Sequence, residues 1–429
     1  MADSTPMATT GVDLLLAGGH VIDPANGLDG IADVAITGGR ISAVGPDLDR
    51  TGAASVLDVA GHIVTPGIID LHVHAFSTHK RSRLSLDPIV ATFSNGVTTV
   101  VDAGTAGYRD FQDFVESVIL RSKVRVLSFV NIVGSGMIGP WEHEPDEMRV
   151  DLAAATVKDF PGIAVGIKTA HYRDFRNAGG NVFDDHYGPW AAVDRAIRAA
   201  EIAGVPVMVD FWPWQGYRSY PELILEKLRP GDIHTHVFAQ QFPIIDEDGN
   251  VYEHMWRARE RGVIFDLGHG AGSFWYRNAA PAIEQGFIPH SISTDLHTGN
   301  LNGAVLSMLT TMNKVLNLGV PLAQVVEMST VAPAREIAHP ELGTLSVGSD
   351  GDVAVFRLDE GAFNYVDCGK WVHPGTQRLS CQLTVRSGEI VFNPEGWGRP
   401  TWQHDDQPRW QVLTTPEIPA GASVAVPAT

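Results

Sequence analysis

Eight short apolar segments run through the middle of the chain, separated by stretches with helical character such as 189–203 and 220–228. They are rich in valine, isoleucine and leucine, as expected for parallel strands that are buried on both faces. Eight strand–helix units over about 270 residues match the size of a TIM (β/α)8 barrel. The alternative, a doubly wound open sheet, would place a glycine-rich phosphate loop after its first strand, and the sequence has none there. The predicted strands are Ile68–Val73, Val97–Asp102, Val124–Ile132, Ile163–Thr169, Val205–Phe211, Ile233–Phe238, Val263–Leu267 and Ser291–Asp295.

Short β-like segments with glycine turns also occur at both ends of the chain. Residues 13–17, 34–36 and 40–44 form such segments near the N-terminus, and 352–356 and 382–391 repeat the pattern late in the sequence. We therefore predict an α/β protein in which both chain ends form one small, discontinuous β-sandwich domain. Its first part is residues 1–64, with a tail at 1–10, and the barrel follows at 65–340. Its second part is 341–395, and a tail occupies 396–429.

The charge and cysteine content exclude several classes of partner and compartment. The chain has 31 lysines and arginines against 50 aspartates and glutamates, a formal net charge of −19, so nucleic acid, heparin and anionic membranes are not expected as partners. The two cysteines, Cys368 and Cys381, make no disulfide framework and suit a reducing cytosol. Residues 1–10 lack the apolar core of a signal peptide, and no segment has the apolar length of a membrane span. These features predict a cytoplasmic protein without a membrane partner.

A pair of histidines closes the first predicted barrel strand. His72 and His74 end the run Thr65–Ala75, in which an apolar β-branched segment follows a Pro-Gly pair. Residues i and i+2 of a strand point to the same face, so both imidazoles can reach one point. Unpaired imidazoles at a buried strand end would be costly. The pair therefore indicates a metal site.

Further candidate ligands occur where other predicted strands end. TIM-barrel enzymes keep their chemistry at the C-terminal ends of their strands, so side chains at these positions converge on one site. Each candidate carries a nitrogen or oxygen that suits a metal ion or proton transfer. They are Lys168 after the fourth strand, Asp210 after the fifth, His236 on the sixth, His269 after the seventh and Asp295 at the end of the eighth.

These candidates lie within motifs that resemble the amidohydrolase superfamily of metal-dependent hydrolases. Within that superfamily, the resemblance is to the deacetylase-like, dihydroorotase-related branch, and it covers about residues 11–392. The motifs are Gly96–Gly104, Gly166–Lys168, Thr235–Phe238, Phe265–Gly270 and Ser293–His297.

The resemblance implies two divalent ions, zinc in the first instance, bridged by hydroxide and by Lys168 carboxylated on its side-chain nitrogen. His72, His74 and Asp295 would hold the more buried ion, and His236 with the fifth-strand residue would hold the other. Two such ions polarise a carbonyl group and lower the pKa of the attacking water. Asp295 would be the catalytic residue that accepts the proton of this water and passes it to the leaving group.

The fifth strand departs from the family pattern, which has a histidine at its end. Here the residue is Asp210. A carboxylate is an acceptable zinc ligand, so replacement in kind is the simplest interpretation. The alternatives are a weakened second site or a site that prefers a harder ion such as Mn²⁺.

Five residues near the strand ends are candidates for substrate contact. The two histidines among them could instead order their own loops. The two tryptophans follow the fifth strand, where they could line a pocket or pack in the core. The arginine could bind a substrate carboxylate through two hydrogen bonds or lie in a solvated loop. These residues are His269, His297, Trp212, Trp214 and Arg173.

The combined pattern predicts a hydrolase that cleaves an acyl amide or ester bond of a small carboxylate-bearing molecule. Two alternatives stay open: hydrolysis of a cyclic amide, as in dihydroorotase or hydantoinase, and a metal-free relative that serves as a scaffold. A D-aminoacylase-like site with one metal is disfavoured, because that type uses a cysteine ligand and both cysteines follow the predicted barrel. A small-molecule substrate is the expected partner, and a homo-oligomer is expected by analogy with barrel hydrolases.

Overall fold

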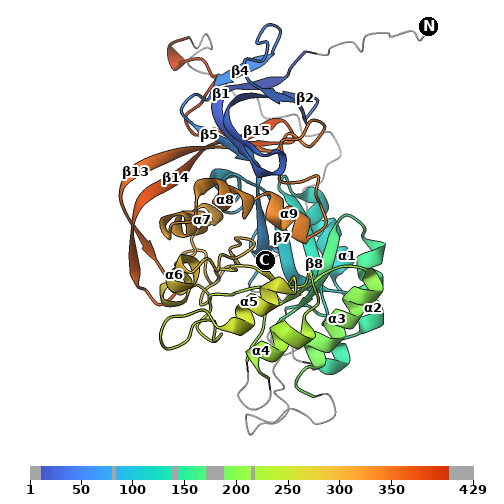
Figure 1. The fold of residues 1–429 in the computed structure, drawn as a ribbon. Helices are drawn as coiled ribbons and strands as arrows, with labels where there is room; N and C mark the ends of the chain where they lie inside the picture. Colours follow the sequence, from blue (N-terminus) through green and yellow to red (C-terminus); the bar gives the residue numbers. More distant parts are fainter. Residues whose placement is uncertain (1–10, 80–83, 138–143, 171–187, 214–217, 405–429) are drawn as a thin grey trace, which may run out of the picture.

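The chain folds into a barrel with a β-domain above it (Figure 1). The computed structural model describes residues 11–79, 84–137, 144–170, 188–213 and 218–404. The two chain ends meet in the β-domain, and the helices of the middle region surround the barrel strands. None of the helices within these ranges is both long and apolar enough to cross a membrane.

Seven parallel strands form the barrel sheet among the described residues. Each strand pairs with the next one in the chain, so spatial order follows sequence order. The helices between them return the chain to the start of the next strand, as parallel pairing requires. The strands are β6 (Ile68–Val73), β7 (Val97–Gly107), β8 (Arg125–Asn131), β9 (Ala164–Thr169), β10 (Val207–Val209), β11 (Ile233–His234) and β12 (Ile264–Phe265).

The segment 291–296 takes the place of the eighth strand and closes the barrel. On one side it makes a parallel bridge between Ser291 and Asp266, and on the other between Leu296 and Val73. The backbone N–H of Asp295 also donates to the carbonyl of His72 at 2.6 Å. The predicted strand Ser291–Asp295 is therefore in the right place, but it is not a regular strand. Its extended conformation ends at Asp295, whose φ is 52°.

The later barrel strands are also shorter than predicted. We predicted a strand over 233–238, whereas β11 ends at His234. Two residues further on, His236 has φ 67°, which no strand residue adopts. The chain thus leaves the sheet early, and the left-handed backbone at His236 redirects this side chain toward the site described below.

The predicted helices form, with their ends set by local capping. The predicted helix 189–203 appears as α3, which ends at Gly204 with φ 74°. The predicted helix 220–228 begins as α4, where the Ser219 side chain accepts from the Glu222 N–H, and continues as the π-helical turn η6 (Leu223–Lys227). The helices are α1 (Phe111–Ser117), α2 (Val150–Asp159), α3 (Ala191–Ala203), α4 (Tyr220–Glu222), α5 (Glu253–Glu260), α6 (Tyr276–Glu284), α7 (Met308–Asn317), α8 (Leu322–Glu327) and α9 (Val331–Glu336).

Both chain ends build the β-domain as one continuous sheet with a hydrophobic cluster of its own. Its spatial order is β15-β14-β13-β5-β1-β2-β3, and β4 pairs with β1. The hairpin of β13 and β14 is long and runs down beside α7 and α6 (Figure 1). The strands are β1 (Leu14–Asp23), β2 (Leu28–Thr37), β3 (Arg40–Gly45), β4 (Ser55–Asp58), β5 (Ile63–Pro66), β13 (Val353–Val366), β14 (Val372–Arg386) and β15 (Glu389–Phe392).

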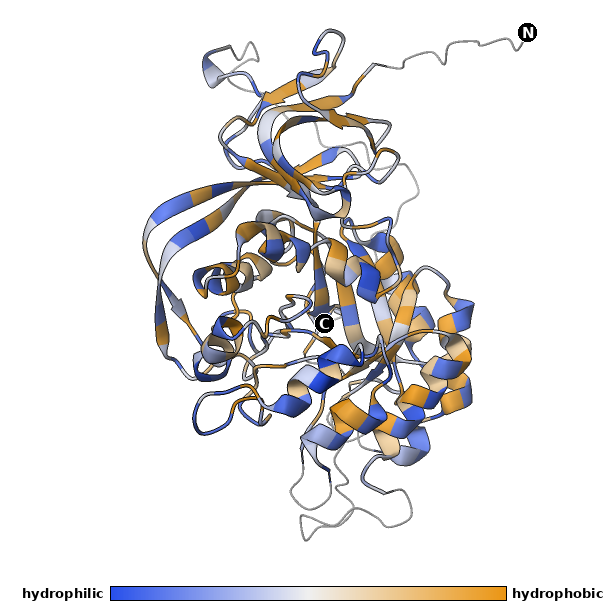
Figure 2. Cartoon of the chain, in the orientation of Figure 1, coloured by the Kyte–Doolittle hydropathy of each residue, from blue (hydrophilic) through white to orange (hydrophobic). Residues whose placement is uncertain are grey.

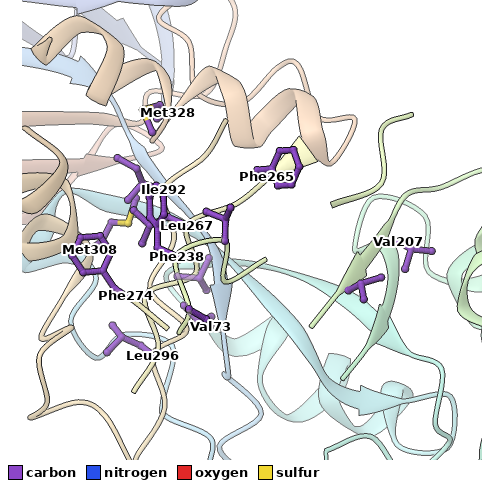
Figure 3. Packing of buried hydrophobic residues seen from close by; sticks show 14 of the residues in the cluster. Val73, Val207, Phe238, Phe265, Leu267, Phe274, Ile292, Leu296, Met308 and Met328 are labelled. Carbon is purple, nitrogen blue, oxygen red and sulfur yellow. The ribbon is translucent and has the colours of Figure 1, made fainter. Parts of the chain in front are cut away.

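Two hydrophobic clusters hold the barrel together. The larger one joins strands and helices, and α2 and α3 carry the hydrophobic and hydrophilic bands that such packing needs (Figure 2). Figure 3 shows Phe274, Leu296 and Met308 of this cluster packed beside Val73, at the end of β6. The smaller cluster draws residues from β6 to β11, with Ile264 of β12 packed against it, so it fills the interior. Its Met208 lies 3.7 Å from the Nζ atom of Lys168, which makes it the floor of a polar site.

Candidate metal centre

Three histidines and one carboxylate from three strand ends meet above this floor, and His72 and His74 share the end of β6. The Oδ1 atom of Asp295 lies 3.1 Å from Nε2 of His74 and 3.4 Å from Nε2 of His72. Its Oδ2 atom lies 3.9 Å from Nε2 of His236. The Asp295 carboxylate thus stands between the histidine pair of β6 and the histidine that follows β11.

Two further predicted ligands complete the group. The Oδ2 atom of Asp210 lies 3.6 Å from Nε2 of His236, and the Nζ atom of Lys168 lies 3.4 Å from Nε2 of His72. Lys168 is fully buried at the end of β9. The structure therefore brings together all six residues that the sequence suggested as metal ligands.

The histidines all present the same nitrogen to the centre because their other nitrogen is held from behind. The Nδ1 atoms of His72 and His74 bond to the hydroxyls of Thr235 and Thr105, at 3.0 and 2.8 Å. The Nδ1 atom of His236 donates to the Gly268 carbonyl at 2.5 Å. Each Nε2 lone pair is consequently directed inward, as metal ligation requires.

The backbone is strained where two of these side chains are aimed. His236 and Asp295 both have left-handed φ values, 67° and 52°. Residues other than glycine adopt this region at a cost, and such strain gathers at functional sites. Here the left-handed residues end two extended segments, so that a side chain at each end can face the barrel axis.

Two glycines leave the space that the site needs. A Cβ atom on Gly104 would lie 2.5 Å from Cβ of Lys168, and one on Gly268 would lie 2.8 Å from Nδ1 of His236. Both glycines also have positive φ, which disfavours any side chain. The motifs that contain them therefore shape the site without supplying ligands.

Burial and close charges set the protonation of the group. Burial and the Lys168 charge hold the pKa of His72 well below its usual value. Burial also lowers the pKa of Lys168, although Asp210 and Asp295 act against this. Burial alone would raise the pKa of Asp295, yet the three histidines hold it below the usual value. Burial opposes charge on His236, but Asp210 and Asp295 raise its pKa to about 9.

The donor set fits a divalent cation. Ligand atoms of His72, His236 and Asp295 all lie within 4.8 Å of one another, so one ion could reach all three. Imidazole nitrogens and carboxylate oxygens are the ligands that Zn²⁺ commonly takes. Among the described residues, the Nε2 atoms contact a lysine and two carboxylates. The arrangement could hold a divalent cation.

The residues predicted to contact substrate lie in different surroundings. The ring of His297 is 6.2 Å from that of His74, and Trp212 is 38% exposed just after β10. His269 is fully buried, with Nε2 2.6 Å from Nζ of Lys314 and Nδ1 3.0 Å from the Gly270 carbonyl. Arg173 and Trp214 lie outside the described residues.

Several residues near the site escaped the sequence analysis. Thr235 belongs to a recognised motif and Thr105 directly follows another, but nothing in their spacing reveals that they contact histidines. Both cysteines follow the barrel in the sequence, which gives no sign that Cys368 approaches it. Its Sγ atom lies 3.9 Å from Nδ1 of His269, because the β13–β14 hairpin returns the chain to the barrel.

Known proteins are similar to this chain in sequence and in fold. The sequence profile described as "Amidohydrolase family" matches residues 63–208 and 276–386, together more than half of the chain. A protein named "Deacetylase" from Brucella anthropi is 33% identical over 334 residues, which cover 77% of this chain and 80% of that protein. A crystal structure described as an adenine deaminase matches with a TM-score of 0.79 and 27% identity, over 89% of this chain and 100% of that one. Another, described as a dihydroorotase, has a TM-score of 0.76 and 29% identity, over 89% and 99% of the two chains.

Proposed function

Because the chain belongs to the amidohydrolase family and is a hydrolase acting on C–N bonds, we propose that it removes an acyl group from a small carboxylate-bearing molecule. The bond cleaved would be an amide or an ester, and two divalent cations would serve as cofactors. One observation carries the proposal: the Asp295 carboxylate stands between the Nε2 atoms of the β6 histidines and that of His236. This geometry supports a role for Asp295 as the base between two proposed sets of metal ligands.

We assign the ligands in two groups. His72, His74 and Asp295 would hold one cation, and His236 with Asp210 would hold the other. The three histidines and two carboxylates suit Zn²⁺, and the carboxylate at Asp210 leaves Mn²⁺ as an alternative at the second position. The contact of 3.6 Å between Asp210 and His236 supports pairing these two residues.

Lys168 would bridge the two cations after carboxylation. In this reaction the neutral Nζ attacks CO₂, an N–C bond forms and one proton leaves, which gives an anionic carbamate. Burial lowers the pKa of Lys168 and so favours the neutral amine that this step needs. An ammonium group 3.4 Å from the His72 ligand nitrogen would repel a cation, whereas a carbamate attracts it.

Asp295 would move the proton during hydrolysis. When bound, the cations polarise the substrate carbonyl and lower the pKa of the attacking water. A carboxylate is ionised at neutral pH, and that of Asp295 stands beside both proposed ligand sets, where it can accept a proton. It then passes this proton to the leaving nitrogen or oxygen.

We propose that the part of the substrate away from the cleaved bond contacts residues that follow the strand ends. The position of His297 beside His74 and the exposed ring of Trp212 at the end of β10 support a role for both. Arg173 and Trp214 stay predictions from the sequence. Both ring nitrogens of His269 bond within the chain, which favours support of its loop over direct substrate contact.

A substrate panel tests the proposal and its alternatives. The purified protein, loaded with zinc in the presence of bicarbonate, is assayed on N-acyl amino acids, O-acyl hydroxy acids, cyclic ureides and adenine. The relative named deacetylase supports turnover of the acyl compounds. The structures described as a dihydroorotase and an adenine deaminase make ureides and adenine the necessary competitors. Turnover of ureides or adenine alone would refute deacylation, and a protein that takes up no metal and turns over none of these compounds would favour the metal-free scaffold.

A further inference from the structure

The two histidines of β6 are each backed by the same sequence of groups. Behind each imidazole stands a buried threonine hydroxyl, and behind each threonine stands a buried aspartate. One arm is His72–Thr235–Asp266, whose residues come from three different segments of the barrel. The other is His74–Thr105–Asp102, in which Thr105 and Asp102 both lie in β7.

The direction of the hydrogen bonds in the first arm fixes the tautomer of His72. The Thr235 hydroxyl donates to Oδ2 of Asp266 at 2.7 Å. A hydroxyl has one proton, so the oxygen of Thr235 can only accept from Nδ1 of His72, 3.0 Å away. The proton of the neutral ring is then on Nδ1, and the lone pair of Nε2 is directed toward the proposed metal.

The second arm places its groups in the same order. Nδ1 of His74 lies 2.8 Å from the Thr105 hydroxyl. Asp102 accepts the backbone N–H groups of Ala75 and Thr105, both at 2.7 Å. The Asp102 carboxylate therefore holds the end of β6, the threonine and, through the threonine, the ring of His74.

Both aspartates are held in place by more than the threonine. Asp266 and Asp102 are fully buried, where a carboxylate needs several donors. Asp266 accepts from the Ser291 hydroxyl at 3.0 Å and from the Ser293 hydroxyl at 2.7 Å. By contrast, His236 is held directly by a backbone carbonyl, so a threonine–aspartate pair is not a general need of buried histidines here.

We propose that Asp266 and Asp102 are positioning residues that fix the ring orientation of His72 and His74, each through one threonine, and that Asp266 also fixes the tautomer of His72. The inference rests on the proposed function, because it takes these two histidines as metal ligands. It adds that four residues that contact no metal contribute to the metal affinity of the site. Partners of this kind are worth about 10–100-fold in metal affinity or activity.

The test compares Thr235→Val with Thr235→Ser. Valine keeps the shape of threonine but removes the hydroxyl, whereas serine keeps the hydroxyl. The control is Thr384→Val, since Thr384 is an equally buried threonine in the β-domain whose hydroxyl donates to the Phe93 carbonyl at 2.7 Å. Zinc affinity is measured by competition with a chromogenic chelator, and the Tm of each metal-free protein is recorded beside it.

We expect Thr235→Val to lose about 10–100-fold in zinc affinity, Thr235→Ser to recover most of that loss, and Thr384→Val to bind zinc like the wild type. Thr105→Val should reproduce the loss through the other arm, which keeps the inference testable if a Thr235 variant does not fold. Wild-type affinity in both valine variants, whatever their metal-free Tm, would overturn it. If the wild type itself takes up no zinc, the proposed function fails first, and the two failures are thus distinguishable.

Discussion

The Asp295→Asn substitution removes the proposed base while it keeps a carbonyl oxygen in nearly the same place. In the structure Oδ1 of Asp295 reaches Nε2 of His74 and His72 at 3.1 and 3.4 Å. An asparagine oxygen can occupy this position and still act as a neutral ligand. It cannot accept a proton at working pH, because an amide is not a base in that range.

The size of the effect follows from the role assigned to the carboxylate. Positioned acid–base groups contribute about 10²–10⁴-fold to rate, equivalent to about 3–5 kcal/mol of barrier. Since the oxygen that contacts both β6 histidines stays, zinc content should stay close to that of the wild type. We therefore expect kcat to fall by about 10²–10⁴-fold with KM changed only a few-fold, the pattern of an interaction lost in the transition state.

The assay measures initial rates on the best acyl substrate from the panel, with zinc content determined on the same sample. The matched control is Asp29→Asn, which removes the same charge from an aspartate–histidine pair on the surface, where Asp29 contacts His20 at 2.6 Å. This variant should keep wild-type kcat. Near-normal kcat in a zinc-loaded Asp295→Asn protein would remove Asp295 as the base.

Three further predictions concern the space in the site, its metal and the buried Glu336 side chain at the end of α9. Gly104→Ala should lower zinc content and activity by about tenfold or more, because its Cβ would lie 2.5 Å from Lys168; Gly27→Ala has a similar positive φ but open space, and should cost only about 1–2 kcal/mol of stability. Dialysis against a chelator should abolish activity and lower the Tm, and zinc with bicarbonate should restore both; activity that survives complete metal loss would contradict the proposal. Burial raises the pKa of Glu336 to about 8, so the folded state keeps a proton that the unfolded state releases above about pH 4.5. Stability from this group is therefore lost between about pH 5 and 8, and Glu336→Gln should lose less Tm than the wild type over that range; parallel Tm curves would show that Glu336 is ionised when folded.

Sequence reasoning predicted the barrel and its ligands because both leave a local signal. Apolar runs without alternation mark strands that are buried on both faces, and β6 begins and ends at the predicted residues. The ends of the later strands were less predictable. His236 and Asp295 leave the extended conformation to aim their side chains, and no propensity scale anticipates a left-handed histidine inside a strand pattern.

The residues that contact the histidines from behind could not be predicted from the sequence, for a different reason. Thr235 and His72 are 163 positions apart, and their contact depends on the barrel closing in one register. The approach of Cys368 to His269 likewise depends on a hairpin that returns from another domain. Contacts of this kind follow from tertiary geometry, whereas the ligands themselves follow from strand ends.

The most direct test of the binuclear proposal is a crystal structure of the protein grown with zinc and bicarbonate. Anomalous scattering would locate the ions, and the density at Nζ would show whether Lys168 is carboxylated. The account predicts two ions, one against His72 and His74 and one against His236, joined by the modified lysine. An unmodified Lys168 with no ion between His72 and His236 would contradict it.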